Sequence, residues 1–195
     1  INNLYGIMIT ASHNPSNENG FKFSFDPYAN ARGEMIEEFK NYVLKNNFLK
    51  GTGRLIKKDI KEEYLNYLKN NINLGNKQLK IVLDPANGSV TSILEDALKL
   101  FNLNYIIING NSDGSFPNHH PDPSVSENLI ELQEAVVNNN ADVGFGFDGD
   151  GDRLGIVDNA GKIVSIEHYA ILIIRKLVNE VNNKKFLYDA KCSDI

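Results

Sequence analysis

Short apolar runs alternate with longer amphipathic stretches along the chain. Runs of about four to eight apolar or alternating residues are typical of β-strands. Such runs occur at residues 5–10, 21–25, 79–84, 104–109, 142–147, 153–158, 162–165 and 186–189. Apolar residues recur with helical spacing at residues 34–46, 59–72, 90–102, 126–139 and 167–181. This alternation favours an α/β fold in which helices sandwich mixed, largely parallel sheets.

The alternation of strand and helix becomes regular only in the second part of the chain. The polar stretch NINLGNKQ at residues 71–78 precedes it and has the composition of a linker. The 195 residues are enough for one large domain or two small ones. We therefore predict one domain over residues 1–75 and a second over residues 76–195.

The net charge and the length of the apolar runs argue against nucleic-acid-binding and membrane-bound functions. The formal net charge is −5, which does not favour binding to a nucleic-acid backbone or to an anionic membrane surface. No apolar run approaches the roughly 20 residues of a membrane span. The single cysteine, Cys192, cannot form an internal disulfide and fits a reducing compartment. We expect a cytoplasmic protein that binds neither nucleic acid nor membrane.

The stretch DGDGD at residues 148–152 places three carboxylates within five residues. Two like charges about 4 Å apart repel by about 1 kcal/mol in water and by several times more near a protein surface. Arg153 alone cannot balance Asp148, Asp150 and Asp152. Oxygen ligands without a neighbouring cysteine or histidine favour Mg²⁺, Mn²⁺ or Ca²⁺ over Zn²⁺. The loop therefore predicts a site for one hard divalent cation with open coordination positions.

Four other interpretations of the acidic loop remain open. A solvated acidic turn needs no ligand. A calcium-binding EF-hand loop has glycine at its sixth position and glutamate at its twelfth, where this chain has Arg153 and Asn159. A Mg²⁺-dependent, aspartate-nucleophile phosphatase could be built on Asp148 and Asp150, but that class has threonine or valine soon after its two aspartates, and here Gly151 and Asp152 follow. A non-catalytic module that binds a divalent cation also stays possible.

A second polar loop, ASHNPSNENG at residues 11–20, also follows a predicted strand. Ser12 and His13 are adjacent, and adjacent residues rarely face each other as a hydrolase triad requires. A turn serine beside a surface histidine is the simplest interpretation. If Ser12 instead carried a phosphoryl group, that group would supply the missing ligand of a metal site, and His13 or Lys22 could move the hydroxyl proton.

Five segments together resemble the α-D-phosphohexomutase family, in its phosphomannomutase/phosphoglucomutase branch. They are TASHNP (10–15), NGFK (19–22), FPNHHPDP (116–123), ENL (127–129) and DGDGDR (148–153). The family has four domains around a cleft. The resemblance implies that residues 1–75 are the C-terminal part of its domain 1, with the phosphoserine loop. It implies that residues 76–195 are its domain 2, with the metal loop.

The resemblance also implies a reaction and a role for each site residue. The reaction interconverts hexose 1-phosphate and hexose 6-phosphate, of mannose or glucose, through a hexose 1,6-bisphosphate. Ser12 matches the phosphoserine, whose phosphoryl group also binds the metal, and the Mg²⁺ ligands match Asp148, Asp150 and Asp152. His13 and Lys22 match the acid/base and phosphate-contacting cluster. Arg153 matches the arginine that touches the phosphoserine.

Two further segments and the extent of the chain allow additional predictions. The segment DPANGS at residues 84–89 and the pair His119–His120 are expected to be structural. The sequence begins at Ile1 within a predicted strand and lacks the family's sugar-reading and phosphate-binding segments. We therefore expect it to be part of a longer protein and to be poor or inactive as a mutase by itself.

Overall fold

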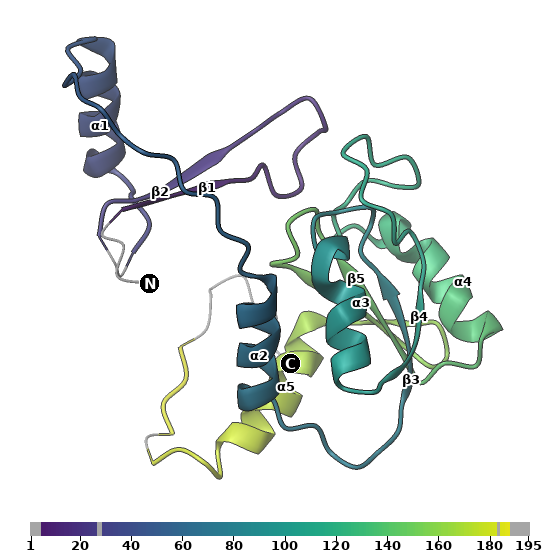
Figure 1. The fold of residues 1–195 in the computed structure, drawn as a ribbon. Coiled ribbons are helices and arrows are strands. Elements are labelled where there is room, and N and C mark those ends of the chain that lie inside the picture. Colours follow the sequence, from purple (N-terminus) through teal and green to yellow (C-terminus); the bar gives the residue numbers. More distant parts are fainter. Residues whose placement is uncertain (1–4, 27–28, 183, 188–195) are drawn as a thin grey trace.

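The computed structural model describes residues 5–26, 29–182 and 184–187. It contains a two-stranded and a five-stranded sheet (Figure 1). The strands are β1 (Gly6–Ile9), β2 (Phe21–Ser24), β3 (Lys80–Asp84), β4 (Asn104–Ile107), β5 (Val143–Phe147), β6 (Leu154–Asp158) and β7 (Ile163–Val164). The helices are α1 (Glu34–Leu44), α2 (Lys61–Asn71), α3 (Thr91–Leu100), α4 (Ile130–Asn138) and α5 (Ile166–Leu177), and a 3₁₀ turn, η1 (Ser126–Leu129), precedes α4.

The five-stranded sheet has the order β4-β3-β5-β6-β7. Strand β3 runs parallel to β4 and β5, whereas β5, β6 and β7 pair antiparallel. Strands joined through a helix are parallel and strands joined by a short connection are antiparallel, as chain geometry requires. The predicted α/β fold with a mixed sheet is confirmed, although parallel pairing is confined to β4-β3-β5.

Helices α3 and α4 cover opposite faces of this sheet (Figure 1). Successive side chains of a strand point to opposite faces. Thus Val82 packs in the cluster that contains Leu132 of α4, while Ile81 and Leu83 pack in the cluster that contains Leu94 of α3. The continuous apolar run of β3 is therefore explained by burial on both faces.

Strand β5, with the sequence VGFGF, presents different residues to the two helices. Phe145 packs with the cluster on the α3 side. On the α4 side, a Cβ added to Gly144 would lie 2.6 Å from Val136 Cγ2 and 2.9 Å from Leu132 Cδ1. The glycines of β5 therefore let α4 pack directly against the strand backbone.

The part before residue 75 is built around the β1–β2 hairpin and the helices α1 and α2. Phe39 of α1 packs against Phe23 and Phe25 with tilted rings, whose centroids lie 4.9 Å and 5.3 Å from that of Phe39. Helix α2 lies beside α3, where Lys61 and Asp96 form an ion pair. No helix among the described residues combines the length and the apolar character of a membrane span.

The predicted strand at residues 186–189 is wrong for its described half. Phe186 and Leu187 have no regular secondary structure and are exposed, and residues 188 and 189 lie outside the described residues. A strand is stabilised by pairing with a neighbour, and no pairing involves Phe186 or Leu187 in the described part of the chain.

A buried polar cluster joins the ends of β3 and β4 to the loop that follows β4. Asp84 is 1% exposed, and its Oδ2 lies 2.9 Å from His119 Nε2. Its other oxygen accepts hydrogen bonds from the Ala86 backbone N–H and from Asn109 Nδ2. His119 Nδ1 lies 3.0 Å from the His120 carbonyl oxygen. These contacts anchor the loop on the sheet.

The His119–Asp84 contact predicts a pH dependence of stability. The hydrogen bond to Asp84 raises the pKa of His119 above its ordinary value. Its contribution is then fully present below the unfolded pKa of about 6.5 and is lost as the pH rises through the higher folded pKa. In urea denaturation, His119→Gln should therefore cost most stability below about pH 6.5, and less at higher pH. His120→Gln is the control, and the same pH dependence in both variants would contradict the assignment.

The packing of β5 predicts that Gly144→Ala is destabilising. The added methyl group would overlap Val136 and Leu132, and overpacking of this kind costs about 1–3 kcal/mol. Gly6→Ala is the matched control, because a Cβ there meets only Ser24 Cβ, at 3.8 Å. Urea denaturation should show a lower free energy of unfolding for Gly144→Ala alone. Equal losses in the two variants would refute this account of the glycine.

Candidate functional site

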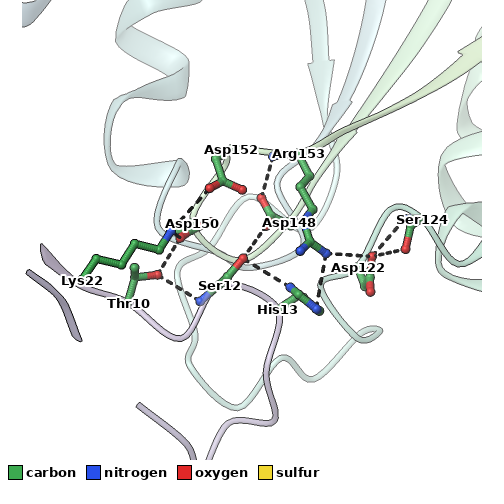
Figure 2. A network of polar contacts seen from close by, with 10 residues as sticks. All are labelled: Thr10, Ser12, His13, Lys22, Asp122, Ser124, Asp148, Asp150, Asp152 and Arg153. Carbon is green, nitrogen blue, oxygen red and sulfur yellow. Dashed lines mark hydrogen bonds and ion pairs between the residues drawn. The ribbon is translucent and has the colours of Figure 1, made fainter. Parts of the chain in front are cut away.

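The serine loop (residues 10–20) and the acidic loop (residues 148–153) meet in one site (Figure 2). Ser12 Oγ donates a hydrogen bond of 2.9 Å to Asp148 Oδ2, a residue 136 positions later in the chain. Thr10 Oγ1 donates one of 2.6 Å to Asp150 Oδ2. The structure thus brings together the two loops that the sequence singled out separately.

The serine loop turns sharply at Ser12. Ser12 has φ 53°, a left-handed conformation that is uncommon outside glycine. Its backbone N–H donates to Thr10 Oγ1 (3.0 Å), and the Asn14 N–H donates to the Ala11 carbonyl (3.0 Å). The loop base is closed by the Thr10 N–H, which donates to the Gly20 carbonyl (2.9 Å). This turn directs the Ser12 hydroxyl toward the acidic loop.

The acidic loop connects β5 to β6, and its first glycine makes room for the serine loop. A Cβ at Gly149 would lie 2.3 Å from the Ser12 carbonyl oxygen, so only glycine allows the observed approach. The Gly149 carbonyl accepts hydrogen bonds from the N–H and the hydroxyl of Ser89. Asp148, fully buried, accepts a 3.0 Å bond from the Arg153 N–H. The loop is therefore held by backbone contacts on several sides.

Three carboxylates of the acidic loop could hold a metal ion. Asp148, Asp150 and Asp152 each offer an oxygen, and the three oxygens lie within 4.8 Å of one another. Asp150 Oδ1 is buried and has no hydrogen-bond partner among the described residues. A buried acceptor without a partner is costly, and a cation would satisfy it. The oxygen-only donor set fits a hard divalent ion.

Two positively charged side chains, Lys22 and Arg153, lie beside the acidic loop. From the sequence, only Arg153 was considered as a partner of the three carboxylates. Lys22 Nζ, from β2, lies 3.7 Å from Asp150 Oδ2 and 3.6 Å from Asp152 Oδ2. Arg153 Nε lies 4.0 Å from Asp148 Oδ2. Burial raises the pKa of Asp150, but the Thr10 hydrogen bond and the Lys22 charge outweigh it and hold this pKa below its ordinary value. Three carboxylates and two cations leave one formal negative charge.

His13 lies between Ser12 and Arg153 (Figure 2). Its Nε2 is 3.3 Å from Arg153 Nη1 and its Nδ1 is 3.3 Å from Ser12 Oγ. A guanidinium can only donate, so Nε2 accepts, and the proton of a neutral imidazole is then on Nδ1. The hydrogen bonds consequently run from Arg153 to His13, from His13 to Ser12, and from Ser12 to Asp148.

Two residues of the site had been quoted within motifs but given no role of their own. Thr10 opens TASHNP, and Asp122 belongs to FPNHHPDP. Asp122 Oδ1 lies 4.0 Å from Arg153 Nη1 and accepts hydrogen bonds from the N–H and the hydroxyl of Ser124. Burial raises the pKa of Asp122, but these hydrogen bonds and the nearby positive charge keep it below its ordinary value. Nothing in the sequence indicated these two roles, because Thr10 and Asp122 approach the other site residues only in the folded chain.

Each residue expected at the site is found near the others. Ser12, His13, Lys22 and Arg153 all contact one another or the acidic loop. His119 contacts Asp84 instead and lies outside the carboxylate group. Ser12 and Asp150 also line a hollow of about 310 Å³, which the described residues leave open on this side of the serine loop.

Comparison with known proteins relates both parts of the chain to one family. Residues 62–161 match the family model described as "Phosphoglucomutase/phosphomannomutase, alpha/beta/alpha domain II". Residues 1–50 match the corresponding model for domain I. Over 190 residues, or 96% of the chain, the sequence is 35% identical to a phosphomannomutase/phosphoglucomutase of Pseudomonas aeruginosa. Over 198 residues, or 97% of the chain, it is 37% identical to a phosphomannomutase of Methanocaldococcus jannaschii.

Solved structures give the same relationship. A phosphoglucomutase/phosphomannomutase family protein from Burkholderia thailandensis superposes with a TM-score of 0.84 at 32% identity, over 90% of this chain and 38% of that one. A structure described as a putative phosphomannomutase, from Thermus thermophilus, shares the fold with a TM-score of 0.72 at 23% identity, over 89% of this chain and 41% of that one. The chain spans about 40% of the length of the Pseudomonas relative and 43% of the Methanocaldococcus one. The matched domains and the identity along nearly the whole chain show that it belongs to the phosphoglucomutase/phosphomannomutase family.

Proposed function

We propose that this chain carries the phosphoserine and the metal-binding part of a phosphohexomutase, an intramolecular phosphotransferase that interconverts hexose 1-phosphate and hexose 6-phosphate. The observation that carries the proposal is the hydrogen bond from Ser12 Oγ to Asp148 Oδ2. It places a hydroxyl that can accept a phosphoryl group directly at a cluster of carboxylates that can hold a divalent ion. Phosphoryl transfer requires this combination of acceptor oxygen and charge neutralisation.

The proposed metal is Mg²⁺, with Asp148, Asp150 and Asp152 as protein ligands and a phosphoryl oxygen on Ser12 as a further one. Mg²⁺ prefers oxygen ligands and is commonly shared between carboxylates and phosphates. The unpartnered, buried Asp150 Oδ1 supports an ion at this place. When bound, the ion would polarise the phosphoryl group and neutralise charge that develops during transfer.

The proposed cycle has two balanced transfers. First, the P–O bond to Ser12 Oγ breaks and a P–O bond to a sugar hydroxyl forms, which gives a hexose 1,6-bisphosphate. The sugar hydroxyl loses one proton and Ser12 Oγ gains one. The second transfer returns the other phosphoryl group of the bisphosphate to Ser12, with the opposite proton movements. No external phosphoryl donor or oxidant is consumed.

His13, Lys22 and Arg153 are proposed to assist these transfers. His13 Nδ1 contacts Ser12 Oγ, so the imidazolium form of His13 would be placed to donate its Nδ1 proton as the P–O bond breaks, whereas the neutral ring would only hold the Ser12 hydroxyl by a hydrogen bond. Arg153 contacts the far side of the His13 ring and so orients it. Lys22 and Arg153 hold positive charge beside the serine, where a phosphoryl group would arrive. Most of the catalytic effect would then come from positioning and charge.

The geometry favours Ser12 over Asp148 as the phosphorylated residue. A phosphatase of the aspartate-nucleophile class needs a carboxylate oxygen that can reach phosphorus. Asp148 is fully buried, and its two oxygens accept hydrogen bonds from Ser12 and from the Arg153 N–H. A module that only binds calcium would not require the hydrogen bond between Ser12 and Asp148.

Substrate and context follow from the relatives. Their names include phosphomannomutase and phosphoglucomutase, so mannose or glucose phosphates are the proposed substrates, with hexose 1,6-bisphosphate as the intermediate. We keep the domain boundary of residues 1–75 and 76–195 as part of the proposal. Its proposed location is cytoplasmic, where sugar phosphates are metabolised, without nucleic-acid or membrane partners.

Phosphate mapping tests the identity of the phosphorylated residue. After incubation with glucose 1,6-bisphosphate and Mg²⁺, peptide mass spectrometry should locate phosphate on Ser12, because its hydroxyl lies at the carboxylate cluster. Ser12→Ala should lose this label, and Ser16→Ala, in an exposed part of the same loop, should keep it. Phosphate on Asp148, or no phosphate on Ser12, would contradict the proposal.

Metal titration tests the ligand set. Asp148→Asn should weaken Mn²⁺ binding at least about tenfold, since it removes a buried ligand and its charge. Asp122→Asn removes a charge from the same neighbourhood but not from the carboxylate group, and should change the affinity far less. Isothermal titration calorimetry measures both. Similar losses in the two variants would indicate general electrostatics instead of coordination.

A further inference from the structure

The Thr10 hydroxyl makes two hydrogen bonds that point to different parts of the site. It donates to Asp150 Oδ2 at 2.6 Å and accepts from the Ser12 backbone N–H at 3.0 Å. Figure 2 shows Thr10 between these two partners. A hydroxyl has one proton and two lone pairs, so it can serve a carboxylate and an amide at the same time. Thr10 therefore links the backbone of one loop to a side chain of the other.

The first hydrogen bond distinguishes the two oxygens of Asp150. Oδ2 is engaged by Thr10 and lies 3.7 Å from Lys22 Nζ. Oδ1 is buried and accepts no hydrogen bond from the part of the chain that the structure describes. Rotation about the terminal carboxylate torsion would otherwise exchange the oxygens, because this torsion is broad and roughly two-fold. The bond from Thr10 thus keeps Oδ1 as the available ligand atom.

Lys22 does not perform the same task. Its contact with Asp150 is an ion pair at 3.7 Å, which is longer than a hydrogen bond, and its side chain is 40% exposed. An ammonium group on a flexible stem acts as a point charge with little preference between two oxygens of one carboxylate. The short hydroxyl bond from Thr10 is the directional contact.

The second hydrogen bond holds the Ser12 turn. Ser12 has φ 53°, and a non-glycine residue in a sparsely populated region of this kind costs on the order of 1–3 kcal/mol. In this turn the N–H of Ser12 donates its hydrogen bond to Thr10 Oγ1. One hydroxyl therefore stabilises the serine's backbone conformation and the orientation of a carboxylate.

We propose that Thr10 is a positioning residue that couples the serine loop to the metal site, by holding Asp150 Oδ2 and leaving Oδ1 for the ion. The proposal rests on the proposed function, since it assumes that the carboxylates bind a divalent ion. It adds a residue that is not among the proposed metal ligands and that acts through Asp150 and the Ser12 amide. Outer partners of this kind typically change metal affinity by about 10–100-fold when removed.

Isosteric variants separate the hydroxyl from the shape of the side chain. Thr10→Val keeps the branched shape and removes the hydroxyl, whereas Thr10→Ser keeps the hydroxyl and removes a methyl group. Thr91→Val is the matched control. The same substitution there also removes a threonine hydroxyl, which donates a hydrogen bond to the Gly88 carbonyl at the start of α3. Isothermal titration calorimetry with Mn²⁺ alone should show about 10–100-fold weaker binding for Thr10→Val, and affinity within about threefold of the wild type for Thr10→Ser and Thr91→Val.

Amide hydrogen exchange of the metal-free protein gives a second measurement. Thr10→Val should speed exchange at the Ser12 amide, whose acceptor is removed, and Thr10→Ser should not. The Asn14 amide is an internal reference, because its acceptor is the Ala11 backbone carbonyl. This measurement does not depend on metal. The NMR spectra recorded for it also report whether each variant is folded.

The outcomes separate this inference from the proposed function. If the wild-type protein binds no Mn²⁺, the metal site itself is refuted. If the wild type binds Mn²⁺ and Thr10→Val binds it equally well, or if Thr10→Ser is as weak as Thr10→Val, the role of the Thr10 hydroxyl is refuted. Unchanged Ser12 exchange in Thr10→Val also refutes the coupling, whatever the metal affinity.

Discussion

The close approach of the Ser12 carbonyl to the backbone of Gly149 is the contact on which the site depends. The two loops come from different parts of the chain, and a single Cβ at position 149 would lie 2.3 Å from the Ser12 oxygen. Once the backbones touch, the hydroxyls of Thr10 and Ser12 reach Asp150 and Asp148. The glycines of DGDGD therefore do more than allow the acidic loop to bend, because they also admit the loop that carries the serine.

The sheet presents the acidic loop through a strand with two different faces. Strand β5 packs its phenylalanines toward α3 and its glycines toward α4, so that both helices pack closely against it. Asp148 follows this strand directly and is buried at its end. The acid closest to Ser12 is therefore placed by the central strand of the core. The more exposed Asp152, later in the loop, has an ion pair with Lys22 at 3.6 Å.

Much of the fold could be predicted from periodicity, because apolar spacing records which side of an element is buried. The helices and most strands were predicted within a few residues, but Phe186 and Leu187 were assigned to a strand that they do not form. Local pattern cannot show whether an apolar run has a neighbour to pair with. From the residues alone, a site shared by Ser12 and the aspartates was one hypothesis beside a simple turn serine, and the resemblance implied the shared site. Ser12 and Asp148 lie 136 positions apart in the sequence, and the periodicity of neither segment indicates that the two residues meet.

The roles of Thr10 and Lys22 illustrate what sequence reasoning missed. A threonine at a strand end is common, and only its position between Asp150 and the Ser12 amide distinguishes it. Lys22 was expected to act on protons or phosphate, and its contacts with Asp150 and Asp152 were not anticipated. Each of these contacts depends on how the hairpin rests on the second part of the chain.

The charges around Ser12 have a consequence for how the site fills. Asp148, Asp150 and Asp152 outnumber Lys22 and Arg153 by one. A divalent ion would make this sum positive, and a phosphoryl group on Ser12, with a charge of about −1.5 to −2 near neutral pH, would make it negative again. In the proposed site, the ion and the phosphoryl group would thus neutralise each other's charge. Phosphorylation of Ser12 would then raise the affinity of the carboxylates for the metal, and by linkage a bound metal would favour the phosphorylated serine.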